Sequence, residues 1–555
     1  MNDWTGGYVS DVEYVPGFYA EQAPGVIDLA CIMAGYEPVR RPGSSAPFTY
    51  CDLGCGHAGT VAALAAANPA GRFWGIDLMP AHIARAEDFR REAGIDNLTL
   101  VEADVAALAE AADPGLPQFD YIALHGLFSW VSDEVRAGIV RFLGRFLRPG
   151  GAVYVGYNVL PGWTDVIPTQ KVLYEYARIQ TGSSVERVSA GIGFLRQMMA
   201  AGAHGLDSCM QERLFADITI PETLQRHRRY LAHEFLNGQW KPRFHLDVAR
   251  ELAAAKLEFA ASANLMENFD GIGLTPEARA LLETVPAGPL RETIEDFFNV
   301  RRFRRDLFVR GRREITAPMR ESMLSEVALA LRGLRPEPDQ REWPMLNMEF
   351  QLNRDVYGPV FDRLEHGPAT VAELRETVRG AGAEVTGNEL VGLLSGLELV
   401  LPVLHDVPAE ALGSCFRHNR VVLREAFRSV RQNLFHLATP VGHTALEFNT
   451  FQTLMLDGMF GGIAPAVEPL TDFVIQRAGI DPDILQEVTE RDASVGAAGP
   501  DGLPQAAGDG TDAAARGRTV QRRAGDIVHD VIEHALTKRV PGWRQLGILP
   551  PERDA

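Results

Sequence analysis

Residues 51–59 of the chain read Cys51-Asp52-Leu53-Gly54-Cys55-Gly56-His57-Ala58-Gly59. An apolar run precedes this stretch, and the apolar segment at residues 60–67 follows it directly. This order predicts a strand that passes through a glycine-rich turn into a helix. Glycines let the backbone of such a turn approach a ligand, and the first amides of the helix point toward an anionic group. We therefore expect a ligand-binding turn within an α/β domain.

Short apolar runs alternate with longer segments of helical periodicity around this turn. We expect strands at residues 48–54, 72–78, 98–104, 119–126 and 152–158. One intervening helix covers residues 80–93, and another follows Ser132, which can cap it, and ends at Pro149-Gly150-Gly151. This alternation is typical of a parallel sheet with crossover helices. Two later runs, at residues 257–265 and 305–310, are expected to be the last two strands of the same sheet.

The glycine spacing alone also matches a dinucleotide-binding turn, with Asp77 about 20 residues further on as the ribose acceptor. Electrostatics distinguish the ligands, because Asp52 at the end of the first strand would repel a pyrophosphate but stabilise the ammonium and sulfonium groups of S-adenosylmethionine. Asp77 and Asp104 end the second and third strands, where one suits the ribose hydroxyls and the other the adenine amino group. Each acid alone is better explained as a helix cap or a solvated strand end. Three acids at successive strand ends favour S-adenosylmethionine.

These motifs resemble the class I methyltransferases, which share the glycine-rich first motif, the acidic second and third motifs, and a turn like Leu147-Arg148-Pro149-Gly150-Gly151 before the fifth strand. The resemblance implies a Rossmann-like seven-stranded sheet with S-adenosylmethionine as the cofactor. The cofactor contacts are then expected from Tyr19, Gln22, Asp52, Gly54, Cys55, Gly56, Asp77, Leu78, Asp104, Val105 and His125. Within the first motif, Cys55 and His57 are tolerated variants and not diagnostic ones.

Flanking motifs narrow the resemblance. They are Tyr14-x-Pro16-x-x-Tyr19-x-x-Gln22-x-Pro24, His125-Gly126-Leu127-Phe128-Ser129-Trp130-Val131 and Tyr157-Asn158-x-Leu160-Pro161-Gly162-Trp163. They look like methyltransferases that bear the methyltransferase regulatory domain, a group that includes rickettsial protein-lysine methyltransferases. The regulatory segment would lie near residues 220–310, where His233-Glu234-Phe235-Leu236-Asn237 and Phe303-Arg304-Arg305-Asp306 resemble that domain. The resemblance is strong over residues 14–310 and loose beyond them.

Methyl transfer from a sulfonium is an in-line displacement, so the protein must exclude water and hold the nucleophile in line. An aromatic-walled channel with polar acceptors would favour a lysine amine. The candidates for this channel are Trp130, Tyr157 and Asn158, which lie at the carboxyl ends of the fourth and fifth strands. Both aromatic residues are also explained as core packing, and His125 is expected to be structural rather than a base. Tyr19 and Gln22 could fold over the cofactor from the N-terminal arm.

The sequence predicts several parts. These are an N-terminal arm that caps the cofactor (1–47), the cofactor-binding core (48–165), inserted helices with the last strands (166–312), a mainly helical C-terminal domain (313–490), a flexible linker (491–520), and a C-terminal helix and tail (521–555). Residues 356–404 predict three helices and a strand, as in a winged helix, with capping boxes that begin at Thr370 and Thr386. In a winged helix, the third helix normally enters the major groove of DNA and contacts it through basic side chains. Residues 388–394 contain no lysine or arginine, so this helix is expected to face protein.

Composition argues against several classes of function. The formal net charge of −19 disfavours sequence-independent binding to nucleic acid. The five cysteines have no metal or redox spacing, and Asn237 stands where a zinc protease motif would need its second histidine, so no metal is expected. Acidic residues replace the basic start of a signal peptide, and no stretch reaches the roughly 18 apolar residues of a membrane span. These features predict a cytoplasmic chain without membrane insertion.

Three functions stay open at this point. The leading one is methyl transfer to a nitrogen nucleophile, expected to be a lysine of a partner protein whose lysine-rich segments the acidic surface would attract. The alternatives are a small-molecule methyltransferase, in which the C-terminal region would form a homodimer, and a cofactor-binding regulator without turnover. DNA methylation fits poorly, because the segment after the fourth strand lacks an Asp/Asn-Pro-Pro-aromatic motif and the chain has no Pro-Cys pair.

Overall fold

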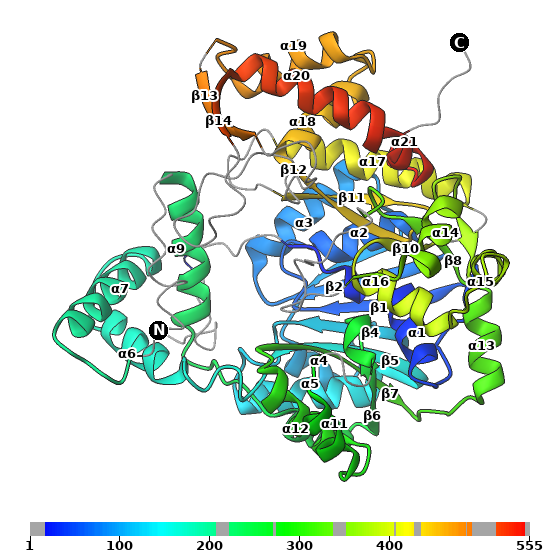
Figure 1. Cartoon of the computed structure of the whole chain (residues 1–555). Helices are drawn as coiled ribbons and strands as arrows, with labels where there is room; N and C mark the ends of the chain where they lie inside the picture. Colours follow the sequence, from blue (N-terminus) through cyan, green and yellow to red (C-terminus); the bar gives the residue numbers. More distant parts are fainter. Residues whose placement is uncertain are drawn as a thin grey trace.

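The computed structural model describes residue 11 and residues 17–206, 221–269, 273–336, 351–403, 407–426, 434–483, 485–490 and 518–549. At its centre lies a seven-stranded sheet with helices on both faces (Figure 1). The N-terminal motif from Tyr14 to Pro16 and the predicted linker up to residue 517 lie outside the described residues.

All seven predicted strands form one sheet, in the order β3-β2-β1-β4-β5-β7-β6. The strands are β1 (Phe48–Leu53), β2 (Gly71–Asp77), β3 (Leu98–Glu102), β4 (Phe119–His125), β5 (Leu147–Asn158), β6 (Leu257–Ser262) and β7 (Phe303–Arg310). The first five pair in parallel, and β7 runs antiparallel between β5 and β6. This is the expected class I methyltransferase fold. Since β7 runs antiparallel, its first residue, Phe303, pairs with the last residue of β5, Asn158.

Each face of the sheet carries its own helices. One face packs against α1 (Pro24–Met33), α2 (Gly59–Ala67) and α3 (Pro80–Ala93). The other packs against α4 (Val105–Glu110), α5 (Asp133–Phe146) and α10 (His245–Ala253). The hydroxyl of Ser132 caps α5, as expected, by accepting a hydrogen bond from the Val135 amide at 3.2 Å. The helix ends at Phe146, earlier than the predicted Pro149-Gly150-Gly151, because Leu147 already pairs with Phe119 of β4.

Before α10, helices inserted after β5 form a separate small bundle, drawn at the left of Figure 1. It consists of α6 (Ile167–Arg178), α7 (Ser184–Ala200) and α9 (Pro221–Phe235). Its core contains Trp163, Leu173, Val188, Leu195, Leu231 and Phe235. Two further helices, α11 (Pro276–Glu283) and α12 (Pro289–Asn299), lie between β6 and β7 in the chain.

After α13 (Ala317–Ser325) the chain forms the predicted unit of three helices with a small sheet. The sheet has the order β10-β8-β9. The elements are β8 (Ala328–Leu331), α14 (Arg354–Leu364), β9 (Ala369–Thr370), α15 (Val371–Gly380), a third helix made of η4 (Glu389–Leu393) and α16 (Leu394–Gly396), and β10 (Val400–Val403). Both predicted capping boxes are present, between Thr370 and Glu373 and between Thr386 and Glu389.

The third helix of this unit packs against other parts of the same chain. Gly392 lies against Met33 of α1 and against Phe269, and Gly396 lies against Met266 of η3 (Leu265–Asn268). A side chain at either glycine would collide with these neighbours. The helix with which a winged helix would meet DNA therefore packs against the domain of the seven-stranded sheet.

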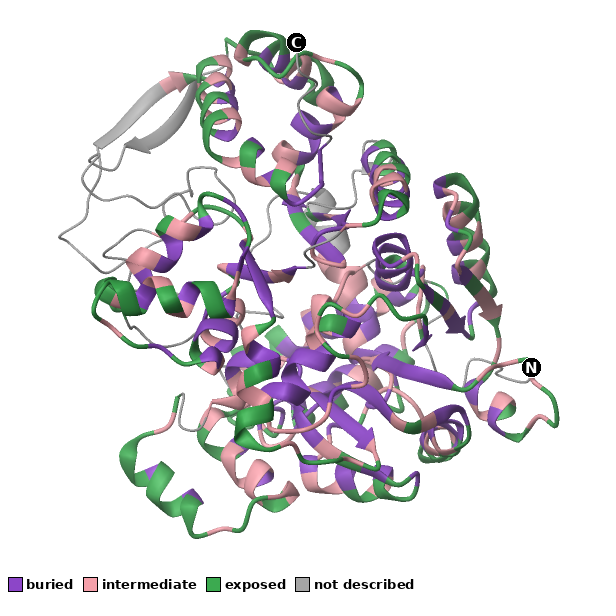
Figure 2. Ribbon diagram, turned by 90° about the vertical axis from the view of Figure 1, so that its right-hand side faces the viewer, coloured by how far each residue is buried: buried purple, intermediate pink, exposed green. Residues whose placement is uncertain are grey.

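The rest of the C-terminal region covers the helix that follows the glycine turn. It comprises α17 (Ala409–Ala426), β11 (Leu434–Thr439), β12 (Thr444–Asn449), α18 (Thr450–Phe460), α19 (Val467–Ala478), β13 (Leu485–Glu490), β14 (Arg518–Arg523), α20 (Ala524–His534) and α21 (Val540–Gln545). Cys415 of α17 contacts the Ala66 carbonyl, and Asn68 bonds with His443 next to β12. Because the sheet and this region both cover α2, residues 60–67 are all buried. The buried residues gather in the interior of the molecule (Figure 2). This explains why that helix is apolar on every side.

Among the described helices, none combines the length and apolar character that crossing a membrane requires. The same part of the chain also holds no group of three side chains arranged to bind a metal ion.

Candidate cofactor and substrate site

The glycine turn lies at the carboxyl end of β1 and is clamped to β2. The amides of Gly54 and Cys55 both donate to the Ile76 carbonyl, at 2.8 and 3.1 Å. Gly54 and Gly56 have φ of +72° and +54°, a left-handed conformation that favours glycine. A Cβ atom added at Gly56 would meet no atom within 4 Å. The turn therefore leaves room beside its backbone, as a ligand-binding turn requires.

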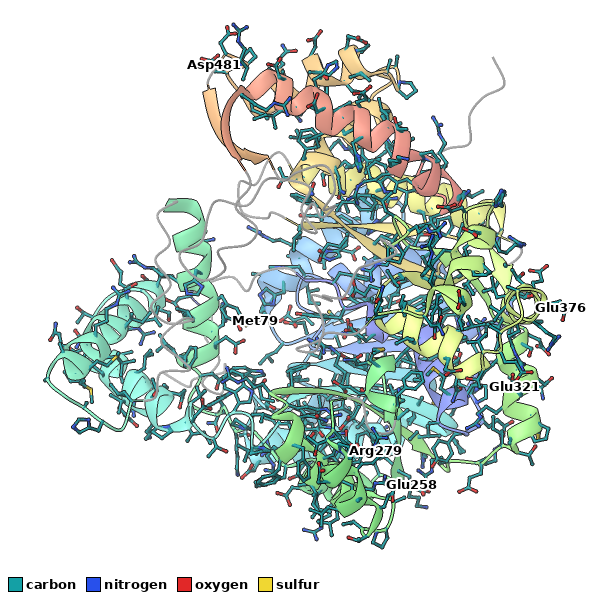
Figure 3. All side chains as sticks on the ribbon, in the orientation of Figure 1. Met79, Glu258, Arg279, Glu321, Glu376 and Asp481 are labelled. Carbon is teal, nitrogen blue, oxygen red and sulfur yellow. The ribbon has the colours of Figure 1, made fainter. Side chains whose placement is uncertain are left out.

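Asp77 fixes this turn in addition to ending β2. Its Oδ2 accepts a hydrogen bond from the Gly56 amide at 2.8 Å. Its Oδ1 accepts one from the Met79 amide at 2.9 Å and lies 3.1 Å from Nδ1 of the buried His82. Met79, labelled in Figure 3, marks this end of the sheet. Sequence reasoning proposed Asp77 as a ribose acceptor and missed both its role in the turn and His82, since no pattern in the sequence pairs them.

Asp52 is buried with little compensation for its charge. Its exposed fraction is 4%. Burial first, and the nearby Asp77 charge second, raise the pKa of Asp52 to about 8. A buried carboxylate of this kind gains most from a cationic ligand. The ammonium and sulfonium groups of S-adenosylmethionine meet that requirement, and the open side of Gly56 gives the ligand access, so these residues fit the expected cofactor.

Asp104 and Leu78 lie at the ends of the next strands in more open surroundings. Asp104 is exposed and caps α4, because its Oδ1 accepts a hydrogen bond from the Ala106 amide at 2.8 Å. The cap explanation therefore applies to this acid. The following residue, Val105, is buried. Leu78 is apolar and yet 37% exposed, directly after Asp77.

The N-terminal arm lies over the glycine turn. The Tyr19 amide donates to the Thr60 hydroxyl at 3.2 Å, and the Gly17 carbonyl packs against Gly59. The Tyr19 ring stacks on His125, with ring centroids 3.5 Å apart and an interplanar angle of 19°. Gln22 of η1 (Ala20–Gln22) is buried, and its carbonyl oxygen accepts a hydrogen bond from the Tyr50 hydroxyl at 3.2 Å. The arm therefore bridges the ends of β1 and β4.

His125 is a neutral residue of this cluster. Its Nδ1 lies 2.8 Å from the Tyr154 hydroxyl. Burial and, second, the positive charge of Arg305 lower the pKa of His125 to about 3, so it does not act as a base near neutral pH. Arg305 also pairs with Glu21 of the arm at 3.1 Å. These contacts agree with the structural role expected for His125.

The three predicted channel residues have different surroundings. Tyr157 has no exposed surface, and its hydroxyl donates to Asp306 at 2.6 Å and lies 3.0 Å from His245. It therefore differs from the expected channel wall, because this position of β5 faces the core under α10. Asn158, one position further, belongs to the opposite face of the strand. It is buried, and its Nδ2 has no hydrogen-bond partner within the described part of the chain. Trp130, after β4, is half-buried.

Both motifs of the predicted regulatory segment meet these residues. Just after α9, the side-chain amide of Asn237 donates through Nδ2 to the Trp130 backbone carbonyl at 3.0 Å. Burial raises the pKa of Tyr19 to about 12, and the negative charges of Asp52 and of Glu234, which belongs to the same motif, contribute to this shift. At the start of β7, the Phe303 ring lies 5.0 Å from that of His125. Sequence reasoning identified both motifs but not these contacts.

Comparisons with known proteins agree with this architecture. A methyltransferase domain matches residues 51–153, and a predicted methyltransferase regulatory domain matches residues 227–310. The uncharacterized protein sll1526 of Synechocystis sp. (strain ATCC 27184 / PCC 6803 / Kazusa) is 30% identical over 458 residues, which is 82% of this chain and 87% of that protein. The uncharacterized protein RP789 of Rickettsia prowazekii is 26% identical over 46% of this chain and 45% of its own length.

A solved structure resembles the chain over almost its whole length. This is PKMT2 from Rickettsia typhi in complex with AdoHcy, with a TM-score of 0.66, 16% identity, and coverage of 97% of this chain and 99% of that one. At this identity the likeness shows the fold. Together with the two domain matches and the Synechocystis relative, this likeness shows that the chain belongs to the class I S-adenosylmethionine-dependent methyltransferases that carry the methyltransferase regulatory domain.

Proposed function

We propose that this chain transfers a methyl group from S-adenosylmethionine to a lysine side chain of a protein. The buried Asp52 beside the open glycine turn carries the cofactor part of the proposal, because a cationic ligand would stabilise the ionised form that burial disfavours. The likeness to the rickettsial PKMT2 supports the protein acceptor. It extends over 97% of the chain, and therefore includes the inserted helices and the C-terminal region as well as the sheet.

In this proposal the cofactor is held by the ends of the first four strands and by the arm. The residues are Tyr19, Gln22, Asp52, Gly54, Cys55, Gly56, Asp77, Leu78, Asp104, Val105 and His125. When bound, the cofactor supplies an electrophilic methyl group on a sulfonium. Asp52 provides the negative charge, and the glycine turn provides the close backbone approach. The stacked rings of Tyr19 and His125 cover the site from the arm and exclude water.

The acceptor amine must lose its proton and its hydration before it attacks. Trp130 supplies an apolar, half-buried surface beside the site. Asn158 supplies a buried side-chain amide whose nitrogen has no partner among the described residues. Such an amide can turn either its oxygen or its nitrogen toward a ligand. In this proposal it orients the amine, and no strong catalytic base is required.

Isothermal titration with S-adenosylmethionine, S-adenosylhomocysteine and NAD, followed by labelled-methyl transfer onto host lysate, tests the proposal. We expect binding of the first two ligands and label in a protein band. Reductive dimethylation of the lysate proteins beforehand blocks lysine amines and should abolish that label. A band that persists would assign another nucleophile, and label in the small-molecule fraction alone would favour the alternative substrate class. Binding of NAD alone would contradict the cofactor assignment.

A further inference from the structure

The segment that follows α9 crosses the carboxyl ends of β4 and β5. The Lys241 amide donates to the Ser129 carbonyl at 2.9 Å, and the Arg243 amide donates to the Asn158 carbonyl at 3.0 Å. Together with the bond from Asn237 to the Trp130 carbonyl, these contacts fix residues 237–243 across the end of the sheet where the acceptor is expected. The whole segment lies within the match to the regulatory domain.

Three indole rings gather at this crossing. The centroids of Trp130 and Trp240 lie 6.1 Å apart, and those of Trp163 and Trp240 lie 5.3 Å apart at an interplanar angle of 79°. Trp163 is buried, and its Nε1 donates to the Arg302 carbonyl at 2.6 Å, so it forms a fixed support. Trp130 and Trp240 are half-buried. Their exposed indole surface is of the type that attracts alkylammonium groups most strongly.

The short motif that contains Asn237 also carries a carboxylate. Glu234 lies in the last turn of α9, three residues before Asn237. Leu231 and Phe235 of that helix point into the core of the inserted bundle, while Glu234 is half-buried. Its negative charge contributes to the raised pKa of Tyr19, and it stands three residues before Asn237, whose side chain bonds to the Trp130 carbonyl. The same short motif therefore brings an acid to the site and positions Trp130 through Asn237.

We propose that Glu234, Trp130 and Trp240 form a binding site for the ammonium group of the methyl acceptor, so that the regulatory segment selects the substrate. This inference rests on the proposed function. The carboxylate attracts the cation, and the indole faces bind its alkyl groups. Because indole surfaces also bind methylated ammonium groups, mono- and dimethyllysine should stay bound and be methylated again. Asn237 is a positioning residue, since it acts through Trp130.

Binding of a small cation to the full-length protein saturated with S-adenosylhomocysteine tests the site without methyl transfer. The probes are N-acetyl-Nε-trimethyllysine methyl ester and its uncharged tert-butyl isostere, titrated by NMR or calorimetry. We expect the cation to bind more tightly than the isostere. Trp240→Ala should lower the affinity for the cation by about 5- to 30-fold, and Glu234→Gln should lower it by about 5-fold. Trp240→Phe should restore most of the affinity.

Two control variants show whether any loss of probe binding is specific to the proposed site. Trp74→Ala removes another half-buried indole, on β2, and Glu175→Gln removes a half-buried acid of α6; both should leave probe binding unchanged. Each variant must bind S-adenosylhomocysteine as the parent does, which excludes misfolding. Equal binding of both probes, no binding of either, or an unchanged affinity in Trp240→Ala and Trp240→Phe would overturn the proposal. If the protein binds the cation but transfers no label to any acceptor, the proposed function is contradicted and the ammonium-binding site is supported.

Discussion

Asp52 of β1 and Asp306 of β7 are both buried carboxylates of one sheet, and their pKa values move in opposite directions. Burial and the Asp77 charge raise that of Asp52 to about 8. Burial alone would also raise that of Asp306, but the charge of Arg304 and hydrogen bonds from His245 and Tyr157 hold it well below the usual value. Burial alone therefore does not assign a role to an acid, because the charges and hydrogen-bond donors around the carboxyl decide the direction of its pKa shift. A compensated acid stabilises the scaffold, and an uncompensated one is suited to a ligand.

The two regions around these acids differ in the same way. Near the glycine turn, hydrogen bonds run mainly to backbone amides, as between Asp77 and Gly56. In the regulatory region, the buried Arg304 pairs with Asp306 at 3.0 Å, Asp296 at 2.8 Å and Glu292 at 2.6 Å. This ion network links α12 with β7 and, through Tyr157, with β5. The regulatory region therefore holds the end of the sheet at which we propose the acceptor site.

The largest effect is expected in the compensated region. Asp306→Asn leaves Arg304 buried beside a neutral side chain, so the free energy of unfolding should fall by about 3–5 kcal/mol. Urea unfolding measures it. Asp247→Asn is the matched control, because the Asp247 side chain on α10 is 44% exposed and pairs with Arg250 at 3.7 Å; it should cost less than about 1 kcal/mol. Equal losses in both variants would remove the distinction between the two regions.

Gly56→Val should abolish tight cofactor binding. The valine side chain would fill the open space beside the turn and strain a left-handed backbone, and we expect the affinity for S-adenosylmethionine to fall by about 100-fold, or 2.7 kcal/mol. Gly115→Val is the control, since Gly115 also has a positive φ, +69°, and open surroundings but lies before β4. Calorimetry should find normal affinity there. Loss of binding in both variants would trace the effect to backbone strain alone.

Asp52→Asn tests the raised pKa of Asp52 through the pH dependence of stability. An acid whose folded pKa is raised binds protons more readily in the folded state, so its contribution to stability falls as the pH rises from about 4 toward 8. In cofactor-free protein, the variant should therefore gain stability over the parent by about 2 kcal/mol between pH 5.5 and 7.5. Its affinity for S-adenosylmethionine should fall by about 1–3 kcal/mol. A parent and variant with parallel pH profiles would mean that Asp52 is already compensated.

The smallest effect is expected at Asp104. Asp104→Ala removes the cap of α4 and should cost about 1 kcal/mol of stability. Asp104→Asn keeps a capping side chain and should recover the loss. Cofactor affinity, measured on both variants, separates the two roles of this acid: a weaker affinity in Asp104→Ala that Asp104→Asn restores would support an adenine contact. Unchanged affinity in both would leave the cap as its whole role.

The sequence predicted the sheet well because its signals are local. Apolar runs and glycine turns gave all seven strands, including β6 and β7, and side-chain caps such as Ser132 and Thr370 marked helix starts. The three acids at the ends of β1 to β3 were also predicted. Their different roles were not, since a helix cap at Asp104 and a buried charge at Asp52 look alike in a sequence.

The fold class, the position of the glycine turn and the two motifs of the regulatory segment follow from the sequence alone, because each depends on residues close together in the chain. Only the tertiary structure decided that Tyr157 belongs to the core, that Asn237 holds Trp130, and that the third helix of the C-terminal unit packs on its own methyltransferase domain. These contacts join residues 149 and 107 positions apart in the first two cases. No periodicity or spacing records such pairs, so packing alone fixes them.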